Sequence, residues 1–237
     1  MIEAVCLSKK GLREENQDFF LINHCKKIFV VADGMGGHNA GQIASTIAVK
    51  TAEKFFEDNN DKYADKALLV TNSMAAANKD VIEHTSVHPE TLGMGTTMIF
   101  MHIDDNGIAY IGHVGDSRAY LINAEGITRL TDDHSYVGEL LRQGSITEED
   151  ALIHPQRNLL MRAIGATPQV EIDLVTHKVN KGDMILLCTD GLYDTVSDDD
   201  IRHVVLQNSV KDTVDILVDT ALKSGSTDNV TVVLIKK

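Results

Sequence analysis

Residues 28–37 read Ile28-Phe29-Val30-Val31-Ala32-Asp33-Gly34-Met35-Gly36-Gly37. The unbroken apolar run at the start of this stretch, mostly β-branched or aromatic, predicts a buried strand. Asp33 ends that strand, and Gly34 after it allows the backbone to turn sharply. A carboxylate at the end of a buried strand is held rigidly, as a ligand to an ion must be. The stretch therefore predicts both a central strand and the first residue of a site.

Three further aspartates stand in the same kind of place. Asp190 ends the apolar run 184–189, and Asp116 follows another such run. Asp228 comes shortly before the run 230–235. Several strand ends that meet at one rim would form an all-oxygen site, which suits Mg²⁺ or Mn²⁺ better than Zn²⁺. Asp beside Gly is also a strong hairpin signal, so the residues alone leave a metal site and a set of turns both open.

The charge balance excludes some classes of partner. The 237 residues carry 35 acidic and 22 basic side chains, a formal net charge of −13, and 23 of the acids are Asp. Nucleic acids and anionic membranes are bound by clustered Lys and Arg, so we expect neither as a partner. Asp is a better helix cap and metal ligand than Glu, so the surplus of Asp indicates caps, a site, or both.

Cysteine usage and the apolar runs bear on location. The three cysteines show no Cys-x-x-Cys spacing, and Cys6 and Cys188 lie in apolar runs, which predicts buried thiols in a reducing compartment. The N-terminal residues do not resemble a signal peptide, and no apolar run is long enough to span a membrane. We therefore expect a cytoplasmic globular protein with a single domain over 1–237.

The periodicity predicts an α+β fold with antiparallel sheets, because strands come in runs and helices in pairs. Two periodic helices follow the first strands, a third comes near the C-terminus, and short helices occupy 135–162. Thr147 with Asp150 predicts a capping box, and Ser197 predicts a helix N-cap. The expected strands are 2–7, 18–22, 28–32, 96–103, 108–114, 119–122, 127–130, 170–175, 184–188 and 230–235, and the expected long helices are 43–56, 63–81 and 210–222.

Arg13 lies five residues before a further acid, Asp18. A guanidinium grips phosphate in a two-pronged fork, so an arginine next to carboxylate-bound metals would orient a phosphoryl group. Considered alone, the same pair fits a surface ion pair that contributes little.

Together these residues resemble a known family. Eight motifs stand in the order found in bacterial metal-dependent serine/threonine phosphatases of the protein phosphatase 2C (PPM) family, over about residues 11–231. They are Arg13-x-x-Asn16-Gln17-Asp18, Val31-Ala32-Asp33-Gly34-Met35-Gly36-Gly37, Gly93-x-Gly95-Thr96-Thr97, Val114-Gly115-Asp116-Ser117-Arg118, Thr131-x-Asp133-His134-Ser135, His154-Pro155-x-Arg157-Asn158, Thr189-Asp190-Gly191-Leu192 and Asp228-Asn229-Val230-Thr231.

The resemblance implies an αββα sandwich, in which two central antiparallel sheets are flanked by helices, with a flap over 141–165. It also implies two catalytic Mn²⁺ or Mg²⁺ ions and a third, weaker ion. By this resemblance the side chains of Asp33, Asp190 and Asp228 and the carbonyl of Gly34 hold the two ions, Asp18 contacts the water around them, Asp116 and Asp194 hold the third, and Arg13 contacts the substrate phosphate.

The mechanism implied is attack on phosphorus by a water that the two metals activate, without a covalent phospho-enzyme. Eukaryotic family members carry a histidine directly after Asp-Gly, where this chain has Met35. A metal-bound water is one candidate replacement as general acid. His38 is another, and for His38 a role at the start of the following helix or in lining the loop is the alternative.

The activity expected from the resemblance is hydrolysis of phosphoserine and phosphothreonine in proteins, by a monomer that opposes a bacterial serine/threonine kinase. A phosphorylated anti-sigma-factor antagonist or a small phosphate ester is an alternative substrate. A non-catalytic binding module is a further alternative, although the metal-site carboxylates Asp33, Asp190 and Asp228 are all present.

Overall fold

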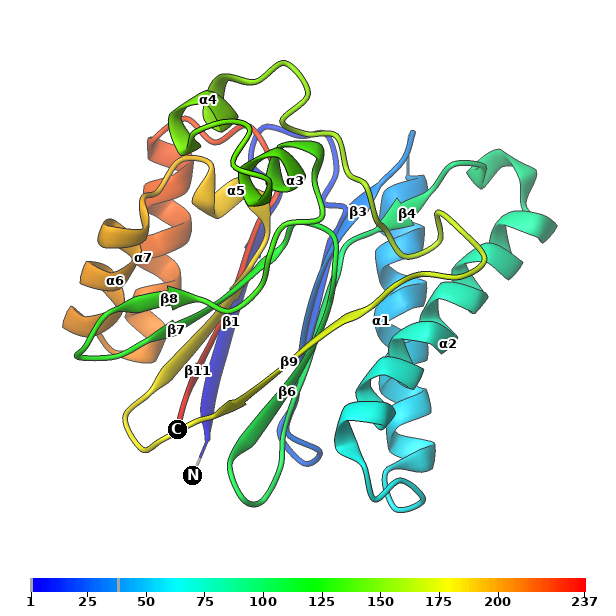
Figure 1. Ribbon diagram of the computed structural model, residues 1–237, viewed down its shortest axis with the longest axis horizontal. Coiled ribbons are helices and arrows are strands. Elements are labelled where there is room, and N and C mark those ends of the chain that lie inside the picture. The colour runs from blue at the N-terminus through cyan, green and yellow to red at the C-terminus, as the bar shows by residue number, and fades with distance from the viewer. Residues whose placement is uncertain (1, 38) are drawn as a thin grey trace.

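Two antiparallel sheets face each other between two layers of helices in the computed structural model, which describes residues 2–37 and 39–237 (Figure 1). One sheet has the order β1-β11-β10-β7-β8, and the other has the order β2-β3-β5-β6-β9 with β4 paired to β3. The expected αββα sandwich is thus confirmed. The strands are β1 (Glu3–Lys9), β2 (Asp18–Asn23), β3 (Ile28–Met35), β4 (Gly95–Thr96), β5 (Met98–Ile103), β6 (Ile108–Val114), β7 (Arg118–Ile122), β8 (Ile127–Arg129), β9 (Asp173–Lys178), β10 (Met184–Cys188) and β11 (Val230–Lys236).

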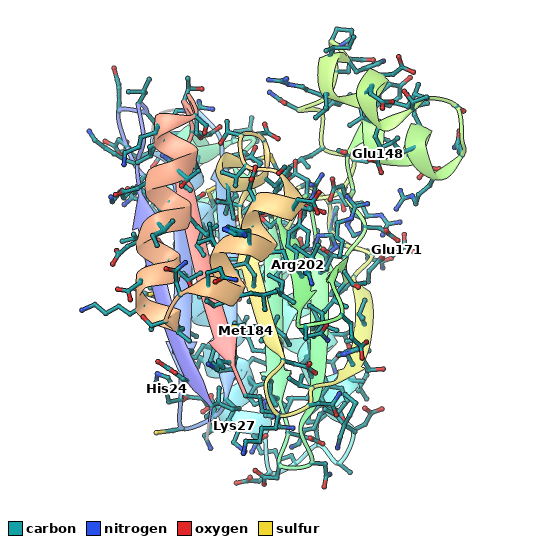
Figure 2. All side chains as sticks on the ribbon, turned by 90° about the vertical axis from the view of Figure 1, so that its left-hand side faces the viewer. His24, Lys27, Glu148, Glu171, Met184 and Arg202 are labelled. Atoms are coloured by element: carbon teal, nitrogen blue, oxygen red, sulfur yellow. The ribbon has the colours of Figure 1, made fainter. Side chains whose placement is uncertain are left out.

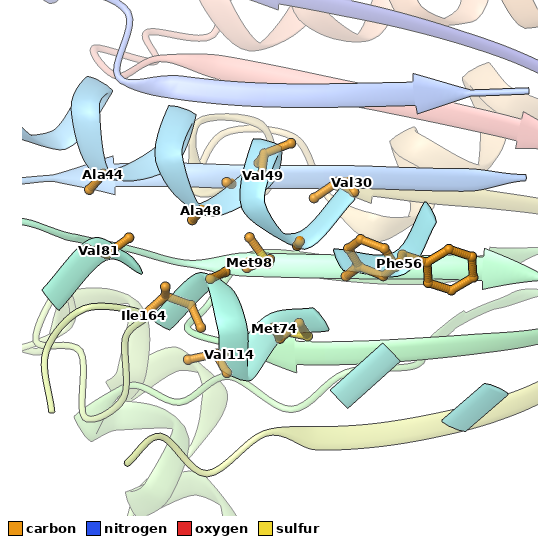
Figure 3. Packing of buried hydrophobic residues seen from close by; sticks show 14 of the residues in the cluster. Val30, Ala44, Ala48, Val49, Phe56, Met74, Val81, Met98, Val114 and Ile164 are labelled. Atoms are coloured by element: carbon orange, nitrogen blue, oxygen red, sulfur yellow. The ribbon is translucent and has the colours of Figure 1, made fainter. Parts of the chain in front are cut away.

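Each sheet buries its outer face under its own helices. Two long helices cover the β3 sheet, and two helices near the C-terminus cover the β10 sheet, while a third apolar cluster fills the space between the sheets. The helices are α1 (Ala40–Asn59), α2 (Lys66–Val87), η1 (Pro89–Thr91), α3 (Tyr136–Arg142), α4 (Glu148–Ile153), α5 (Asp190–Tyr193), α6 (Asp198–Gln207) and α7 (Val210–Lys223). Figure 3 shows the cluster under α1 and α2, where Phe56, Met74 and Met98 pack without exposure to solvent.

One end of the sandwich collects the aspartates that the sequence singled out. β2 and β3 pair so that Asp18 lies directly opposite Asp33. β10 ends two residues before Asp190, and its antiparallel neighbour β11 begins two residues after Asp228. Strands that run in opposite directions bring the end of one beside the start of the next, so the four carboxylates meet at the same end of the two sheets.

Several boundaries differ from the expected ones. The run 96–103 is divided into β4 and β5 at Thr97, whose backbone and hydroxyl are bonded to Asp33 instead of continuing one strand. The run 170–175 becomes a strand only from Asp173, because Val170 and Ile172 pack against the helix-covered core from a connecting segment. The helix expected from residue 63 begins at Lys66, since the carboxylate of Asp65 caps it by accepting from the backbone N–H groups of two residues.

The two cysteines expected to be buried behave differently. Cys188, on the central strand β10, is fully buried, whereas Cys6 is only half-buried. Cys6 lies on β1, which forms the edge of its sheet and is covered from fewer directions. The prediction of a buried thiol was therefore correct for Cys188 and wrong for Cys6.

The segment 141–165 contains α4 and the last two residues of α3, and it projects beyond the end of the sandwich, where Glu148 is labelled in Figure 2. The capping box of Thr147 with Asp150 and the N-cap at Ser197 are both confirmed. Within residues 2–37 and 39–237, no helix combines the length and the apolar character needed to cross a membrane.

Candidate metal centre

Asp33 is held at the end of β3 by two threonines from the Gly-x-Gly-Thr-Thr motif. Its backbone N–H donates to the hydroxyl of Thr97 at 2.9 Å. Its carbonyl accepts from the hydroxyl of Thr96 and from the backbone N–H of Thr97, both at 2.8 Å. Three bonds fix the backbone on both sides of the side chain, so the direction of the carboxylate is set largely by its neighbours.

Gly34 sits where no other residue fits. A Cβ added to Gly34 would lie 2.1 Å from the carbonyl oxygen of Gly41, at the start of α1. The glycine-rich stretch after Asp33 thus lets the first turn of α1 pack directly against the end of β3. The Gly34 carbonyl therefore stays next to Asp33 at the same end of the strand.

Asp18 lies beneath the site and is almost completely buried. Its Oδ2 accepts from the hydroxyls of Thr189, at 2.9 Å, and Thr231, at 2.6 Å. No hydrogen bond from the described residues reaches its Oδ1. Burial raises the pKa of Asp18 to about 7, although both threonine hydrogen bonds favour the charged form.

The pKa values of Asp33 and Asp190 are both raised, and for the same two reasons, burial and neighbouring negative charge. Burial and then the charges of Asp18 and Asp190 raise the pKa of Asp33 well above its ordinary range. Burial and then the charges of Asp116 and Asp228 do the same for Asp190. Asp190 also has a buried Oδ1 that no described residue contacts by a hydrogen bond. Like charges collected at buried positions are costly without a cation between them.

Asp228 joins the acidic cluster to Arg13. Its Oδ2 accepts from a guanidinium nitrogen of Arg13 at 2.6 Å, and its Oδ1 accepts from the backbone N–H of Asn229 at 2.8 Å. The buried side chain of Asn229 then binds the backbone of three residues in the loop that carries Arg13, namely Lys10, Glu15 and Gln17. Asn229 thus clamps the Arg13 loop beside the metal-site carboxylates.

Most of the predicted site residues line one cleft of about 1370 Å³; they are Arg13, Asp33, Gly34, Asp116, Asp190 and Asp228. Asp18 lies behind its wall, and Asp194 is exposed at the end of α5. Although the residue is exposed overall, partial desolvation of its carboxylate raises the pKa of Asp194, and the charge of Asp228 adds to that rise. His38 lies outside the described residues.

The donor set fits divalent cations. It consists of carboxylate oxygens and a backbone carbonyl, which are the oxygen ligands that Mg²⁺ and Mn²⁺ prefer. A bound cation would give a partner to the buried oxygens of Asp18 and Asp190 that lack one. It would also lower the raised pKa values of these carboxyl groups by stabilising their charged forms. Among the described residues, no three His, Cys, Asp or Glu side chains already stand as an assembled set of ligands, and Asp228 is engaged by Arg13.

Comparison with known proteins identifies the family. A family model described as protein phosphatase 2C matches residues 9–227. This chain belongs to the protein phosphatase 2C family. The resemblance seen in the eight motifs is therefore confirmed over nearly the whole chain.

Relatives and solved structures agree with the family. The chain is 33% identical over 227 residues to the serine/threonine phosphatase stp of Listeria monocytogenes. The matched residues cover 94% of this chain and 90% of that protein. It is similar to the crystal structure of the Mycobacterium tuberculosis serine/threonine phosphatase PstP/Ppp, with a TM-score of 0.92, 34% identity and coverage of 99% and 98%. A structure of the PstP catalytic domain in complex with two manganese ions is similar at a TM-score of 0.89 and 32% identity, covering 99% and 97%.

Sequence reasoning missed a second group of residues, which position the site. Arg118 binds both carboxylate oxygens of Asp133, at 3.0 and 2.7 Å, and its guanidinium lies 3.6 Å from the centre of the Tyr193 ring. The Tyr193 hydroxyl donates to the carbonyl of Asp116 at 3.0 Å. Asp133, which falls on a family motif, is thus in a partly buried ion pair, and the signal available was the Asp-Ser-Arg motif in which Arg118 follows Asp116.

His134 links the Asp116 loop to the base of the flap. Its Nδ1 accepts from the backbone N–H of Gly115 at 3.2 Å, so the hydrogen is assigned to Nε2, which lies 3.1 Å from the Asp173 carboxylate. The His134 carbonyl accepts from the backbone N–H of Met161 at 2.7 Å. A histidine without an assigned role therefore connects two parts of the site.

Proposed function

We propose that this protein hydrolyses phosphoserine and phosphothreonine in other proteins with the help of two Mn²⁺ or Mg²⁺ ions. The observation that carries the proposal is the meeting of Asp33, Asp190 and Asp228 in one cleft with Arg13. Membership of the protein phosphatase 2C family and the relatives named serine/threonine phosphatases support it. The Mn-bound structure of a similar catalytic domain supports the choice of metals.

The residues divide the work. Asp33, Asp190, Asp228 and the carbonyl of Gly34 would hold the two ions, with Asp18 behind them. When bound, the ions would supply Lewis acidity, which lowers the pKa of an attacking water and offsets charge on the phosphoryl oxygens.

A third ion, at Asp116 and Asp194, is part of the same proposal. The pKa of Asp116 is raised to about 7 by burial and then by the charge of Asp133, and the charge of Asp194 adds to it. The two acids thus lie near enough to repel each other, which a cation would offset.

Arg13 binds and orients the substrate phosphate. Its side chain is 60% exposed, so the guanidinium is free to turn from Asp228 toward a phosphoryl group in the cleft. The planar fork then places two N–H donors on two phosphoryl oxygens and fixes the in-line direction of attack. His38 remains our candidate for the proton donor to the leaving alkoxide.

Two of the three cysteines, Cys25 and Cys188, are badly placed to act as nucleophiles. Cys188 is fully buried and burial raises the pKa of its thiol, which disfavours the reactive thiolate. Cys25 is exposed, but it lies in the turn between β2 and β3, at the far end of the strands that carry Asp18 and Asp33. Both positions support attack by water without a covalent phospho-enzyme.

The wider setting is also proposed. We infer a single catalytic domain that works as a monomer, opposes a serine/threonine kinase in the cytoplasm, and uses 141–165 as a flap. The three free cysteines, as expected in a reducing compartment, support the cytoplasmic setting. The flap joins the cleft through its last residues, which include Leu159 and Met161.

Activity assays with a matched control test the function. We expect Mn²⁺-dependent hydrolysis of p-nitrophenyl phosphate and of a phosphothreonine peptide, and a loss of at least about a hundredfold in kcat for Asp190→Asn. Asp199→Asn, on the exposed first turn of α6, is the control and keeps its activity. Full turnover after exhaustive treatment with EDTA, or in Asp190→Asn, would contradict the proposal. Hydrolysis of p-nitrophenyl phosphate without any of the peptide would favour a small phosphate ester as substrate.

A further inference from the structure

The cleft extends well beyond the acidic residues. From Asp33 it continues between the C-terminal end of α2, with the loop after η1, and the chain that returns from the flap. We call this extension the apolar branch and define it by the lining residues Ile82, Leu92, Met94, Met161, Ala163 and Pro168. A cavity that joins a charged centre to an apolar arm is suited to a ligand with both kinds of group.

The apolar branch presents large side chains to solvent. Leu92 is 82% exposed and Met161 is 60% exposed, and the neighbouring Leu159 is 46% exposed. A single exposed apolar residue is normal on a protein surface, but several on facing walls of one cleft mark a place where another molecule binds. The walls come from segments far apart in the sequence, so local chain geometry alone does not explain their exposure.

The apolar branch and the metal-site carboxylates share one rigid frame. Thr96 forms a two-way backbone pair with Ile164, at 3.0 and 2.9 Å, while its hydroxyl donates to the carbonyl of Asp33. Ile164 itself is fully buried and packs in the same core cluster as Val81 of α2 (Figure 3). The carboxylate end of the cleft and the wall of the apolar branch are therefore held in a fixed position relative to each other, and a ligand that reaches from Asp33 into the branch contacts both.

A buried asparagine fastens the outer wall. The side chain of Asn78, on α2, accepts from the backbone N–H of Gly165 at 2.7 Å and donates to the carbonyl of Thr167 at 3.0 Å. It also lies 3.4 Å from the carbonyl of Pro168. The segment that forms this wall is thus held against the helix, as a preformed binding wall must be.

Charge divides the cleft into two halves. Arg13, Glu14 and Glu15 line it with the aspartates, whereas the other arm is lined, besides the six apolar residues, by uncharged polar residues such as Thr85 and Ser86 and by one charged residue, Arg162. The guanidinium of Arg162 is paired with Glu171 at 3.1 Å and Asp173 at 2.8 Å. The branch therefore offers little to a charged group and favours an apolar one.

We propose that the apolar branch is a subsite for an apolar side chain that flanks the phosphorylated residue of the substrate, with Leu92 and Met161 as specificity-determining contacts. The inference rests on the proposed function and names a feature of the substrate class. The occupant is a segment of the phosphoprotein, because the branch is continuous with the cleft in which the phosphate is bound. An extended peptide anchored by its phosphoryl group would place a neighbouring side chain between the two walls.

Kinetics on a peptide series test the proposal. Phosphothreonine peptides carry one leucine, moved through the positions on both sides of the phosphothreonine, and matched peptides carry serine there. For the protein loaded with Mn²⁺, we expect one leucine position to raise kcat/KM by about tenfold through a lower KM. Leu92→Ser and Met161→Ser should reduce this preference to about twofold or less, with kcat/KM for p-nitrophenyl phosphate unchanged. Both side chains are more than half exposed, so neither change removes a core contact.

A control and a binding measurement separate the outcomes. Leu68→Ser, near the other end of α2 and about 21 Å along the helix from Ile82 at 1.5 Å per residue, should keep the full preference. Fluorescence anisotropy measures the binding of a labelled leucine peptide to the Asp190→Asn variant. Adding Leu92→Ser to this variant should weaken that binding by about the factor lost in kcat/KM. Equal rates for leucine and serine peptides at every position, or a preference that survives both substitutions, would overturn the inference and leave the proposed function intact. No hydrolysis of p-nitrophenyl phosphate by the wild type with Mn²⁺ would overturn both.

Discussion

Asp18 and Asp33 face each other across two paired strands, although like charges in that position destabilise a sheet. Both aspartates are nevertheless present, and each is held by its own pair of threonines. Two threonine hydroxyls donate to Asp18, and the backbone and hydroxyl groups of two other threonines bind the backbone of Asp33. A residue choice that opposes stability while its neighbours hold it in place is typical of a functional site. The presence of two facing aspartates is therefore explained better by a need to bind a cation than by a contribution to the stability of the fold.

Arg13 is the residue for which function and stability separate most clearly. We expect Arg13→Ala to lower kcat/KM for a phosphothreonine peptide by about 10- to 100-fold, because the phosphate loses its fork of donors. Arg13→Lys should recover only part of this, since an ammonium group cannot bind two oxygens in one plane. Steady-state kinetics and thermal melting check both, with Lys10→Ala as the control. The exposed ion pair with Asp228 contributes little to stability, so a large fall in Tm would contradict this interpretation.

His113 makes a pH-dependent contribution to stability. It is fully buried with its ring 4.5 Å from that of His134, and burial lowers its pKa to about 3. In the unfolded chain the residue takes up its proton near pH 6.5, so below that pH the unfolded state binds more protons and the folded state loses stability. Between pH 7 and pH 5 we expect the free energy of unfolding to fall by about 2 kcal/mol more in the wild type than in His113→Leu.

Urea unfolding in EDTA at both pH values measures this difference. The carboxylates of the site also titrate in this range, but they are common to both proteins and cancel in the comparison to first order. Equal pH dependence in the two proteins would show that His113 titrates normally in the folded state.

At the scale of elements, a buried side chain joins α2 to the segment 165–168. Asn78 is almost fully buried, and its side-chain amide bonds backbone groups on that segment. Helices and loops are normally joined by many weak contacts, so a single buried amide that satisfies several backbone groups carries an unusual share of this junction.

Removing that amide should cost more than removing a less buried one on the same helix. We expect Asn78→Ala to lower the free energy of unfolding by about 2–3 kcal/mol, because the N–H of Gly165 and the carbonyl of Thr167 are left unpaired. Asn72→Ala, on the same helix, loses a single hydrogen bond to the Tyr63 hydroxyl and should cost less than about 1 kcal/mol. Urea titrations of the two variants make the comparison, and equal costs would mean that the junction does not depend on Asn78.

At the scale of the whole molecule, the acidic cluster couples metal binding to stability. Divalent cations bind the folded chain, where the carboxylates meet, and not the unfolded chain, where they are dispersed. At a Mn²⁺ concentration of about 100 times Kd we expect Tm to rise by roughly 5–10 °C. Differential scanning fluorimetry with Mn²⁺ and with EDTA measures the rise, and an unchanged Tm would contradict the assignment of the site.

The Asp190→Asn substitution tests the same coupling by removing one of the clustered charges. Burial and neighbouring charges raise the pKa of Asp190 well above its ordinary range, so its charged form is unfavourable in the folded protein. In EDTA we therefore expect the variant to have a higher Tm than the wild type, and in Mn²⁺ to gain less. Asp199→Asn should behave like the wild type in both conditions. A lower Tm for Asp190→Asn in EDTA would show that this carboxylate stabilises the fold.

The sequence by itself determined the α+β class, the strand that carries Asp33, the strands that lie next to Asp190 and Asp228, and the caps at Thr147 and Ser197. These features follow from periodicity and local hydrogen bonding, which act between residues close in the chain. The family motifs added the order of the site residues, although not the roles of their neighbours.

Only the tertiary structure decided what each of these residues touches. Asp18 binds Thr231 across 213 positions of sequence, and Asn78 binds Thr167 across 89. The split at Thr97 and the half-exposed Cys6 likewise depend on which strand pairs with which and on which strand forms an edge. Contacts between distant segments are set by how the sheets and helices pack, and no local pattern of residues contains that information.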